Sequence, residues 1–467
     1  MSKENQGLNI SKRSFVVAIA VIFVLMVLTY VLALTLPGGE YARIADENGN
    51  MIIDTAAGFR SVEGGLPFWK WLLSPVLVLT VDGSATILAV ILFLIVIGGI
   101  FNALDKCGLM RYLLGLISYK YGTSRYRLMA VTIFFFMAMG ALIGSFEECV
   151  PLVPIVVALA ISLGWDALTG MAMSLLAVGC GFASGVCNPF TVGVAQGLAG
   201  LPMFSGLWLR LLAFVLIYAL LFWFTRSHAR AVAKSESDVT AESAAFRPDP
   251  KMGRAVKLFT GILGAGIVLV LCSPFITALQ DYTMIIVAIM FLVAGIAGAR
   301  ASGMTGRELG ASFGSGVKSM LPAILMILMA SSIKFTLEQS HVLDTILFGA
   351  VGIANRLPKG IVILFIYAFV LVMNFFIASG SAKAFLLIPL IVPLAQIFGI
   401  SPQLCIVAYA FGDGFSNVFY PTNPVLLISL GLADVSYGRW AKWTLRFQLL
   451  NLILTSAVLL FGLAVGY

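Results

Sequence analysis

The chain has 467 residues, of which 60% are hydrophobic and 11% are charged, whereas a soluble domain has about 45–50% apolar and about 25% charged residues. This composition excludes an ordinary soluble protein and indicates an integral membrane protein whose partners include membrane lipid. The net charge of +8 comes from few charged residues, and a basic excess in a membrane protein usually marks its cytoplasmic loops. Nucleic acid is therefore not expected as a partner.

The first apolar run, residues 14–35, follows a short basic segment. It is longer than the apolar core of a signal peptide, which has about 7–15 residues. We therefore predict a retained first span after a cytoplasmic N-terminus, residues 1–13.

The remaining spans follow from length, because a helix needs roughly 20 apolar residues to cross the hydrocarbon core. The helices at 105–124 and 341–357 join equivalent elements of the internal repeat described below and are expected to be interfacial connectors. The apolar runs after the first fall, in chain order, near residues 84–104, 128–163, 167–200, 206–225, 257–279, 282–300, 319–339, 360–399, 401–433 and 443–465.

Two of the longest runs are interrupted by polar residues. The run 128–163 is broken at Gly144-Ser145-Phe146-Glu147-Glu148, and the run 360–399 is broken at Ser379-Gly380-Ser381-Ala382-Lys383. Both are predicted to be re-entrant hairpins, which return to the side from which they enter. The runs 167–200 and 401–433 are predicted to be discontinuous helices.

The loop charges define a topology. Residues 226–256 are rich in basic side chains and are predicted to be a flexible cytoplasmic linker, whereas residues 36–66 are mainly acidic and are predicted to lie outside. With two hairpins, every other loop obeys the positive-inside rule. The prediction is an all-α polytopic protein with about nine full spans, two hairpins and two discontinuous helices, its N-terminus inside and its C-terminus outside.

An internal repeat is the strongest signal in the sequence. Asn188-Pro189 is followed by Gly197-Leu198-Ala199, and Asn423-Pro424 is followed by Gly431-Leu432-Ala433. In the predicted topology the copy within residues 14–225 begins outside and the copy within 280–467 begins inside, with 257–279 as a connecting span. Inverted repeats of this kind are typical of secondary transporters, because the inward-open and outward-open states then have similar energies.

The hairpin tips contain ionisable groups, which are costly at membrane depth and usually functional. Glu147 and Glu148 are candidates for substrate binding and proton coupling, or they cap the following half-helix. For Lys383 the sequence leaves three alternatives, which are contact with a substrate carboxylate, pairing with a buried acid, or extension toward the membrane surface. The further candidates at the two tips are Ser145, Ser379, Gly380 and Ser381.

The discontinuous helices supply the remaining candidates. In each, an Asn-Pro pair removes a helix donor and offers an amide to an ion or substrate, although a simple proline kink would leave the same pattern. Asp413 either couples a cation or pairs with Lys383, and Lys334 and Glu338 are expected to pair with each other outside the site. The candidate substrate-binding residues here are Cys187, Asn188, Thr191, Asn417, Thr422 and Asn423.

Six cysteines show neither a Cys-x-x-Cys pair nor a regular spacing. They are expected to be buried thiols in helix packing. No metal site and no cofactor is predicted, apart from H⁺ or Na⁺ as a coupling ion.

The hairpin-tip and Asn-Pro segments together resemble the YfcC-like branch of the anaerobic C4-dicarboxylate carrier (DcuC) family, within the ion transporter superfamily. The resemblance covers nearly the whole chain in span order. It implies a homodimer in the bacterial inner membrane, a scaffold domain, and a transport domain that carries both hairpins and moves like an elevator. It also implies exchange of basic amino acids. The sodium symporters of the superfamily usually have Ser-Asn-Thr at both tips, and this chain does not.

The charges of the candidate site agree with a cationic substrate, because three acids face one lysine. We expect transport of a small amino acid or carboxylate, with a basic amino acid preferred, and keep a proton- or sodium-coupled C4-dicarboxylate carrier as the alternative. An intramembrane enzyme is disfavoured because Gly412-Asp413-Gly414 does not match the Gly-x-Gly-Asp motif of the aspartyl type and no HExxH motif occurs. A channel is the other remote alternative.

Overall fold

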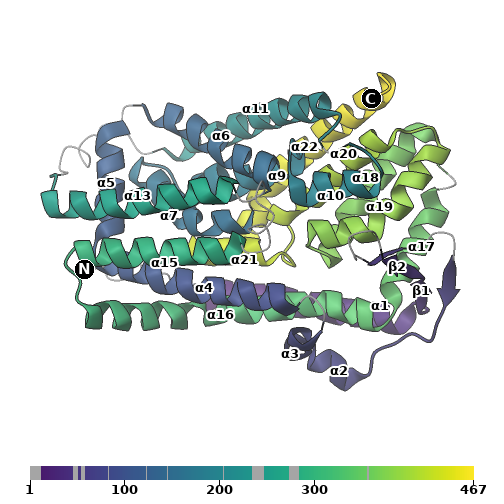
Figure 1. Ribbon diagram of the computed structural model, residues 1–467, viewed down its shortest axis with the longest axis horizontal. Coiled ribbons are helices and arrows are strands. Elements are labelled where there is room, and N and C mark those ends of the chain that lie inside the picture. The colour runs from purple at the N-terminus through teal and green to yellow at the C-terminus, as the bar shows by residue number, and fades with distance from the viewer. Residues whose placement is uncertain are drawn as a thin grey trace.

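The computed structural model describes residues 12–45, 51–53, 58–81, 84–121, 124–144, 146–202, 204–233, 247–272, 283–354 and 357–467. The fold is mostly helical, and many of the helices run along the longest axis of the molecule (Figure 1). The long uninterrupted helices are α1 (Lys12–Thr35), α4 (Ser84–Lys106), α11 (Leu207–Val232), α13 (Pro250–Cys272), α15 (Thr283–Ala301), α16 (Gly306–Gln339) and α22 (Tyr437–Ala464).

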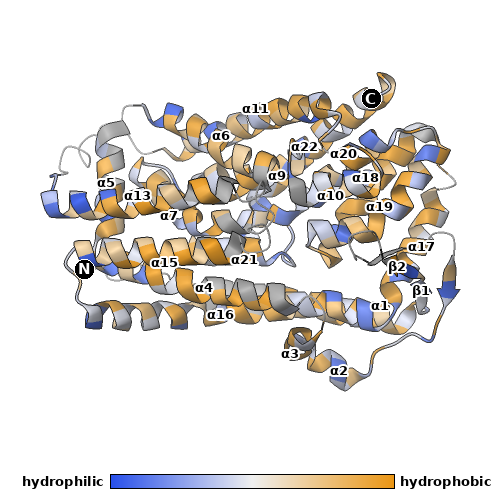
Figure 2. Ribbon diagram, in the orientation of Figure 1, coloured by the Kyte–Doolittle hydropathy of each residue, from blue (hydrophilic) through white to orange (hydrophobic). Residues whose placement is uncertain are grey.

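Hydrophobic residues cover most of these helices, and hydrophilic residues gather at the two ends of the long axis (Figure 2). Among the described residues, six helices are long and apolar enough to cross a membrane. Large apolar side chains such as Trp223 and Ile453 are exposed, as expected where lipid takes the place of water. The six helices are Arg125–Leu142, Ala167–Ser184, Leu207–Val232, Gly306–Gln339, Gly380–Ile397 and Tyr437–Ala464.

The segment after α1 contains strands that the sequence did not predict. They form two small antiparallel ladders, in which Glu40 pairs with Arg60 and Ile44 pairs with Ile52. Three short helical pieces then lead to α4. The elements are β1 (Gly39–Tyr41), β2 (Arg43–Ala45), β3 (Met51–Ile53), β4 (Phe59–Ser61), α2 (Phe68–Leu72), α3 (Ser74–Leu77) and the 3₁₀ turn η1 (Val78–Thr80).

These strands are held against α17 (Val342–Ala354). Arg43 places Nη2 3.0 Å from both carboxylate oxygens of Asp344, and the Tyr41 backbone N–H donates to the same carboxylate at 2.9 Å. The Phe59 and Phe348 rings stack with their centroids 4.3 Å apart. One guanidinium nitrogen thus contacts both carboxylate oxygens, and together with the hydrogen bond from the Tyr41 backbone this charge-assisted contact holds the ladders against α17.

In the first half, the interrupted runs form broken elements. Helix α5 (Leu109–Tyr121) precedes these elements. Helices α6 and α9 each end at a glycine in the left-handed region, with φ of 76° at Gly144 and 55° at Gly185. Glycine terminates helices in this way because it lacks a Cβ. The pieces are α6 (Arg125–Ile143), η3 (Glu147–Leu152), α7 (Val153–Ser162), α8 (Ala167–Met171), η4 (Ala172–Leu176), α9 (Ala177–Ser184), η5 (Pro189–Gly193) and α10 (Val194–Leu198).

The second half has the corresponding pieces. Ser379 caps α19 by accepting a hydrogen bond from the Ala382 backbone N–H, and Ser401 caps α20 by accepting from Leu404. The pieces are α18 (Lys359–Phe376), α19 (Gly380–Ile397), α20 (Pro402–Gly414), the 3₁₀ turn η7 (Phe415–Val418) and α21 (Pro424–Leu432).

Each half of the chain contacts the broken elements of the other half. Helix α19 of the second half packs against η5 and α10 of the first, while η3 and α7 of the first half pack against α21 of the second. The broken helices α9 and α20 also cross closely, because a Cβ added to Gly414 would lie 2.3 Å from the Cα of Ala183. Each hairpin therefore lies against the second half-helix of the other copy.

Two boundaries differ from the sequence-based prediction. Helix α11 continues to Val232 and α13 begins at Pro250, so the ends of the predicted linker 226–256 are helical. Helix α16 begins at Gly306, well before the predicted span 319–339, because Thr305 and Glu308 form a capping box there. Charged residues extend these helices beyond the apolar stretch that a hydropathy pattern detects.

Candidate functional site

A buried ion pair lies at the centre of the broken elements. Lys383, in the first turn of α19, places its Nζ 2.6 Å from Oδ1 of Asp413, near the end of α20, and neither side chain is exposed. The structure therefore adopts one of the alternatives that the sequence left open, the pairing of Lys383 with a buried acid. Two buried charges are retained where their mutual attraction and further hydrogen bonds offset the loss of water. Oδ2 of Asp413 has no hydrogen-bond partner within the described part of the chain.

Asparagine side chains extend this pair into a network. The Lys383 ammonium also donates to the Asn374 side-chain carbonyl and, at 3.0 Å, to the backbone carbonyl of Ile377. Asn374 donates in turn to Asn417 Oδ1 at 2.9 Å, and the Asn423 amide donates to the same oxygen at 2.9 Å. A continuous polar chain thus runs from the second hairpin to the start of α21.

Three elements meet beside the ion pair. A Cβ added to Gly380 would lie 2.6 Å from Asp413 Oδ2 and 2.6 Å from the Thr191 methyl carbon. The Tyr409 hydroxyl donates to the Gly380 backbone carbonyl. Three segments that are far apart in the sequence therefore converge on one point. They are the tip of the second hairpin, the break of the first discontinuous helix and the Asp413 region of the second discontinuous helix.

The Asn-Pro pairs begin the second half-helices. Asn423 Oδ1 accepts from the Val425 backbone N–H at 2.9 Å, with Pro424 at the first helical position, and Asn188 Oδ1 accepts from the Thr191 backbone N–H at 3.3 Å. Proline is favoured at that position because its missing N–H would have no helical partner. The motif is thus a helix start, and the asparagine oxygens already serve as caps.

Two hydroxyl groups near the breaks have no hydrogen-bond partner within the described part of the chain. They belong to Thr191 and Thr422, whose side chains are 1% and 7% exposed. Cys187 is half-buried in the break, and its backbone N–H donates to the Ala141 carbonyl of α6. A buried hydroxyl can donate one hydrogen bond and accept two, so these groups are available to a bound ion or substrate.

The first hairpin tip is described only in part. Ser145 lies outside the described residues, as do the side chains of Glu147 and Glu148, whose backbone begins η3. The ring of Phe146 lies 5.9 Å from that of Phe182 on α9, and η3 packs against α21. The backbone of this tip is therefore next to the half-helix that Asn423 begins.

At the second tip, Ser379 is exposed and Ser381 is half-buried. Ser379 acts as the cap of α19. The described residues contain no group of three or more His, Cys, Asp or Glu side chains that could hold a metal ion. Among the described side chains at the breaks, the polar groups are amides, hydroxyls, the Cys187 thiol and the Lys383–Asp413 ion pair.

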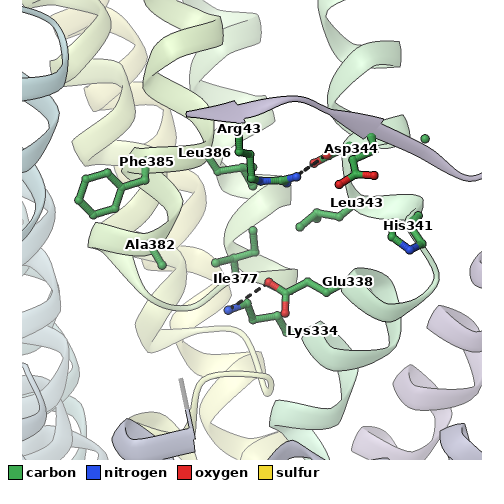
Figure 3. Close-up of a pocket in the computed structure, with 12 residues that line it drawn as sticks. Arg43, Lys334, Glu338, His341, Leu343, Asp344, Ile377, Ala382, Phe385 and Leu386 are labelled. Carbon is green, nitrogen blue, oxygen red and sulfur yellow. Dashed lines mark hydrogen bonds and ion pairs between the residues drawn. The ribbon is translucent and has the colours of Figure 1, made fainter. Parts of the chain in front are cut away.

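A cavity of about 340 Å³ opens beside the second hairpin tip (Figure 3). Ile377 and Ala382, which flank the Lys383 contacts, line one wall, and Lys334 and Glu338 line another as an ion pair at 3.2 Å. That pairing confirms the sequence-based expectation for these two residues. The other charged or titratable lining residues are Glu40, Arg43, His341 and Asp344.

Sequence reasoning missed Asn374 and Tyr409. Asn374 lies in the apolar helix α18 and Tyr409 lies one turn before Asp413 in α20, and both are buried. A lone Asn between Met373 and Phe375 in an apolar span is itself a signal, because an amide in hydrocarbon needs a partner. The partner could not be identified without the fold.

The chain matches the family described as C4-dicarboxylate anaerobic carrier over residues 15–464. A relative from Escherichia coli (strain K12), named "Putative basic amino acid antiporter YfcC", is 32% identical over 405 residues, which are 82% of this chain and 79% of the relative. An uncharacterized protein of Haemophilus influenzae is 24% identical over 390 residues, which are 78% of this chain and 73% of that protein.

Two solved structures align over most of the chain at low similarity. The YdaH transporter of Alcanivorax borkumensis aligns with 97% of this chain and 99% of its own, with a TM-score of 0.47 and 19% identity. MtrF of Neisseria gonorrhoeae, from a class of antimetabolite efflux pumps, aligns with 96% of this chain and 94% of its own, with a TM-score of 0.43 and 16% identity.

Proposed function

Because the chain belongs to the C4-dicarboxylate anaerobic carrier family, we propose that it is a secondary active transporter that exchanges basic amino acids by alternating access. Membership of a transporter family, together with the apolar helices, makes it an integral membrane protein. The observation that carries the proposed substrate class is the buried pair of Lys383 and Asp413, at the point where three broken elements converge.

An amino acid complements this ion pair in both charges. Its α-carboxylate can bind the Lys383 ammonium while one of its ammonium groups binds Asp413, so that opening the pair leaves neither charge alone. A dicarboxylate offers nothing to Asp413, and breaking a buried pair on one side costs about 3–5 kcal/mol. The pair therefore favours a substrate that carries both signs.

The surrounding charges favour an additional positive charge on the substrate. The cavity beside the hairpin tip contains the carboxylates of Glu40, Glu338 and Asp344 against two basic side chains, Arg43 and Lys334. Within the described part of the chain, both basic groups are paired with acids, and Glu40 has no ion pair. Glu147 and Glu148 at the other tip would add two carboxylates, and a relative carries the name of a basic amino acid antiporter.

The second candidate function is a proton- or sodium-coupled C4-dicarboxylate carrier. The description of the family favours it, and Lys383 offers one cation to a carboxylate. In this alternative Asp413 would have to be protonated or paired with a coupling cation while a dianion binds.

Counterflow in proteoliposomes separates the two candidates. We expect vesicles loaded with arginine, lysine or ornithine to accumulate labelled arginine at least about tenfold faster than unloaded vesicles, because an exchanger changes its orientation readily only while a substrate is bound. Vesicles loaded with succinate or fumarate should behave like unloaded ones. Acceleration by succinate or fumarate together with no response to any amino acid would instead establish the dicarboxylate carrier.

The proposed transport cycle depends on the contacts between the two halves of the chain. Each hairpin lies against the half-helix of the opposite copy, which supports movement of both hairpins as one body past a scaffold. We further propose a homodimer in the bacterial inner membrane, with about nine spans, two hairpins and the N-terminus in the cytoplasm, as the loop charges of the sequence indicate.

Glu147 and Glu148 are proposed to couple protons to substrate binding. Adjacent carboxyl groups within an otherwise apolar run of the sequence cannot both ionise easily, so the pair should bind one proton near neutral pH and release it when a cationic substrate arrives. We expect arginine binding to weaken as pH falls in wild type and to depend less on pH in Glu147→Gln or Glu148→Gln.

Glu308→Gln is the matched control, because Glu308 lies in an exposed capping box that glutamine also satisfies. Its pH profile should match that of wild type. Profiles of the same shape in wild type and in both tip variants would show that neither tip carboxyl carries the proton and would favour their role as a helix cap.

A further inference from the structure

Three arginines surround one tyrosine ring at the start of α6 and the end of α11. The guanidinium carbons of Arg125, Arg226 and Arg230 lie 5.5, 5.5 and 5.9 Å from the centroid of the Tyr126 ring. Cation–π attraction favours each guanidinium at this distance from the ring. Three like charges around one ring also repel one another, so the cluster favours an anion.

Two buried donors in this cluster point to the same conclusion. Within the described part of the chain, the indole N–H of Trp165 and the Nε–H of Arg226 are buried and have no hydrogen-bond acceptor. Trp165 is 4% exposed, and its ring lies 5.5 Å from that of Tyr126. A buried donor without an acceptor is destabilising, because it has lost its hydrogen bonds to water. An acceptor-rich anion would supply a partner to both donors.

Asp166, which follows Trp165 in the sequence, already has other partners. Burial raises the pKa of Asp166, but hydrogen bonds from His228 and Thr169 outweigh it and lower the pKa to about 2. The Asp166 carboxylate lies 3.2 Å from His228 Nε2 and 3.4 Å from Arg439 Nη2. Among the ion pairs of the described residues, none joins Arg226 or Arg230 to a carboxylate.

The cluster borders a cavity on the outer face of α11. The cavity has a volume of about 550 Å³ and is lined by Phe222, Trp223, Arg226, Ser227, Arg230 and Ala231. Trp223 is 59% exposed, and tryptophan is enriched where a membrane helix passes the headgroup level. Apolar and aromatic residues toward one end and arginines toward the other match the two parts of a phospholipid.

We propose that Arg226 and Arg230, with Trp165 and Tyr126, form a binding site for the headgroup phosphate of an anionic phospholipid. The guanidinium groups bind the phosphate oxygens, since planar donor pairs match phosphate geometry. An acyl chain follows Trp223 along α11. Loop charges predict that this end of both helices is cytoplasmic, and basic pockets on that side are suited to anionic headgroups.

The test uses the purified full chain in detergent. Its melting temperature is followed by circular dichroism while phosphatidylglycerol, phosphatidylcholine or inorganic phosphate is added. A ligand that binds the folded state raises the melting temperature with its concentration. We expect phosphatidylglycerol to raise it, with the other two additions at the same concentration giving little or no shift.

The double variant Arg226→Gln/Arg230→Gln should need about tenfold more phosphatidylglycerol for the same shift, because two charge-assisted hydrogen-bonding groups are lost. Arg307→Gln, an exposed arginine at the start of α16, is the matched control and should respond like wild type. Should the double variant not fold, Arg230→Gln alone is measured, with several-fold weakening expected.

Three outcomes would overturn the proposal. Phosphatidylcholine could shift the melting temperature as much as phosphatidylglycerol, which would indicate no headgroup recognition. Inorganic phosphate could shift it equally at the same concentration, which would indicate a site for a soluble anion. The phosphatidylglycerol shift could also remain unchanged in the arginine variants, which would place the lipid elsewhere.

Discussion

Replacing Lys383 with Met, or Asp413 with Leu, is expected to lower the free energy of unfolding by about 3–5 kcal/mol, because each change leaves the other charge buried and unpaired. Both side chains are fully buried, with 2.6 Å between Nζ and Oδ1. The double variant Lys383→Met/Asp413→Leu should recover most of this loss, since it removes both charges together. Unfolding in mixed detergent micelles measures the difference.

Transport should be lost in all three variants, including the stable double variant, because the proposed substrate binds through both charges. The matched control is Arg439→Gln, which breaks the pair with Asp166 at 3.4 Å, away from the cavity beside the hairpin tip. That pair is partly exposed, and such pairs contribute about 0–1 kcal/mol. Transport by the double variant at the wild-type rate would show that the ion pair only holds the fold together.

Much of the fold could be predicted because breaks in membrane helices leave local signals. The runs around Ser379 and around Asn423 are too long for one span and contain residues that end or start helices, and the structure has helix ends at both. The asparagine of each Asn-Pro pair was predicted as a ligand, whereas in the structure its oxygen caps a helix. Spacing places a motif but does not show which of its atoms are already bonded.

The contacts that define the site could not be predicted, because they join distant segments. The sequence offers several possible partners for Lys383 and for Asp413. Only the packing of α19 against α20 brings these two side chains together. His228 was assigned to a linker, yet it lies on α11 and contacts Asp166, which is 62 positions away. The strands that contain Glu40 and Arg43 are too short for a pattern and depend on docking to Asp344.

The last prediction separates capping from ligand binding at the two Asn-Pro pairs. Asn423 uses its oxygen to cap α21 and its amide nitrogen to bind Asn417, and Asn188 uses its oxygen to accept from Thr191. Asn423→Asp retains a capping oxygen and loses the donor, whereas Asn423→Ala loses both. The alanine variant should therefore show the loss of about 1 kcal/mol expected for a missing cap, while any loss in the aspartate variant comes from the new buried carboxylate.

If the amides are equivalent ligands in the two halves, both the Ala and the Asp variants at Asn188 and Asn423 should weaken arginine binding by about tenfold or more, the effect of losing one hydrogen bond to a charged group. Equilibrium binding to detergent-purified protein measures this, and the melting temperature reports the cap. Full affinity in the Asp variants, with weak binding only in the less stable Ala variants, would mean that the asparagines act as helix starts and that substrate contacts lie with Lys383 and Asp413. Because the two residues occupy matching positions in inverted copies, a large effect at one and none at the other would also contradict a shared role across the repeat.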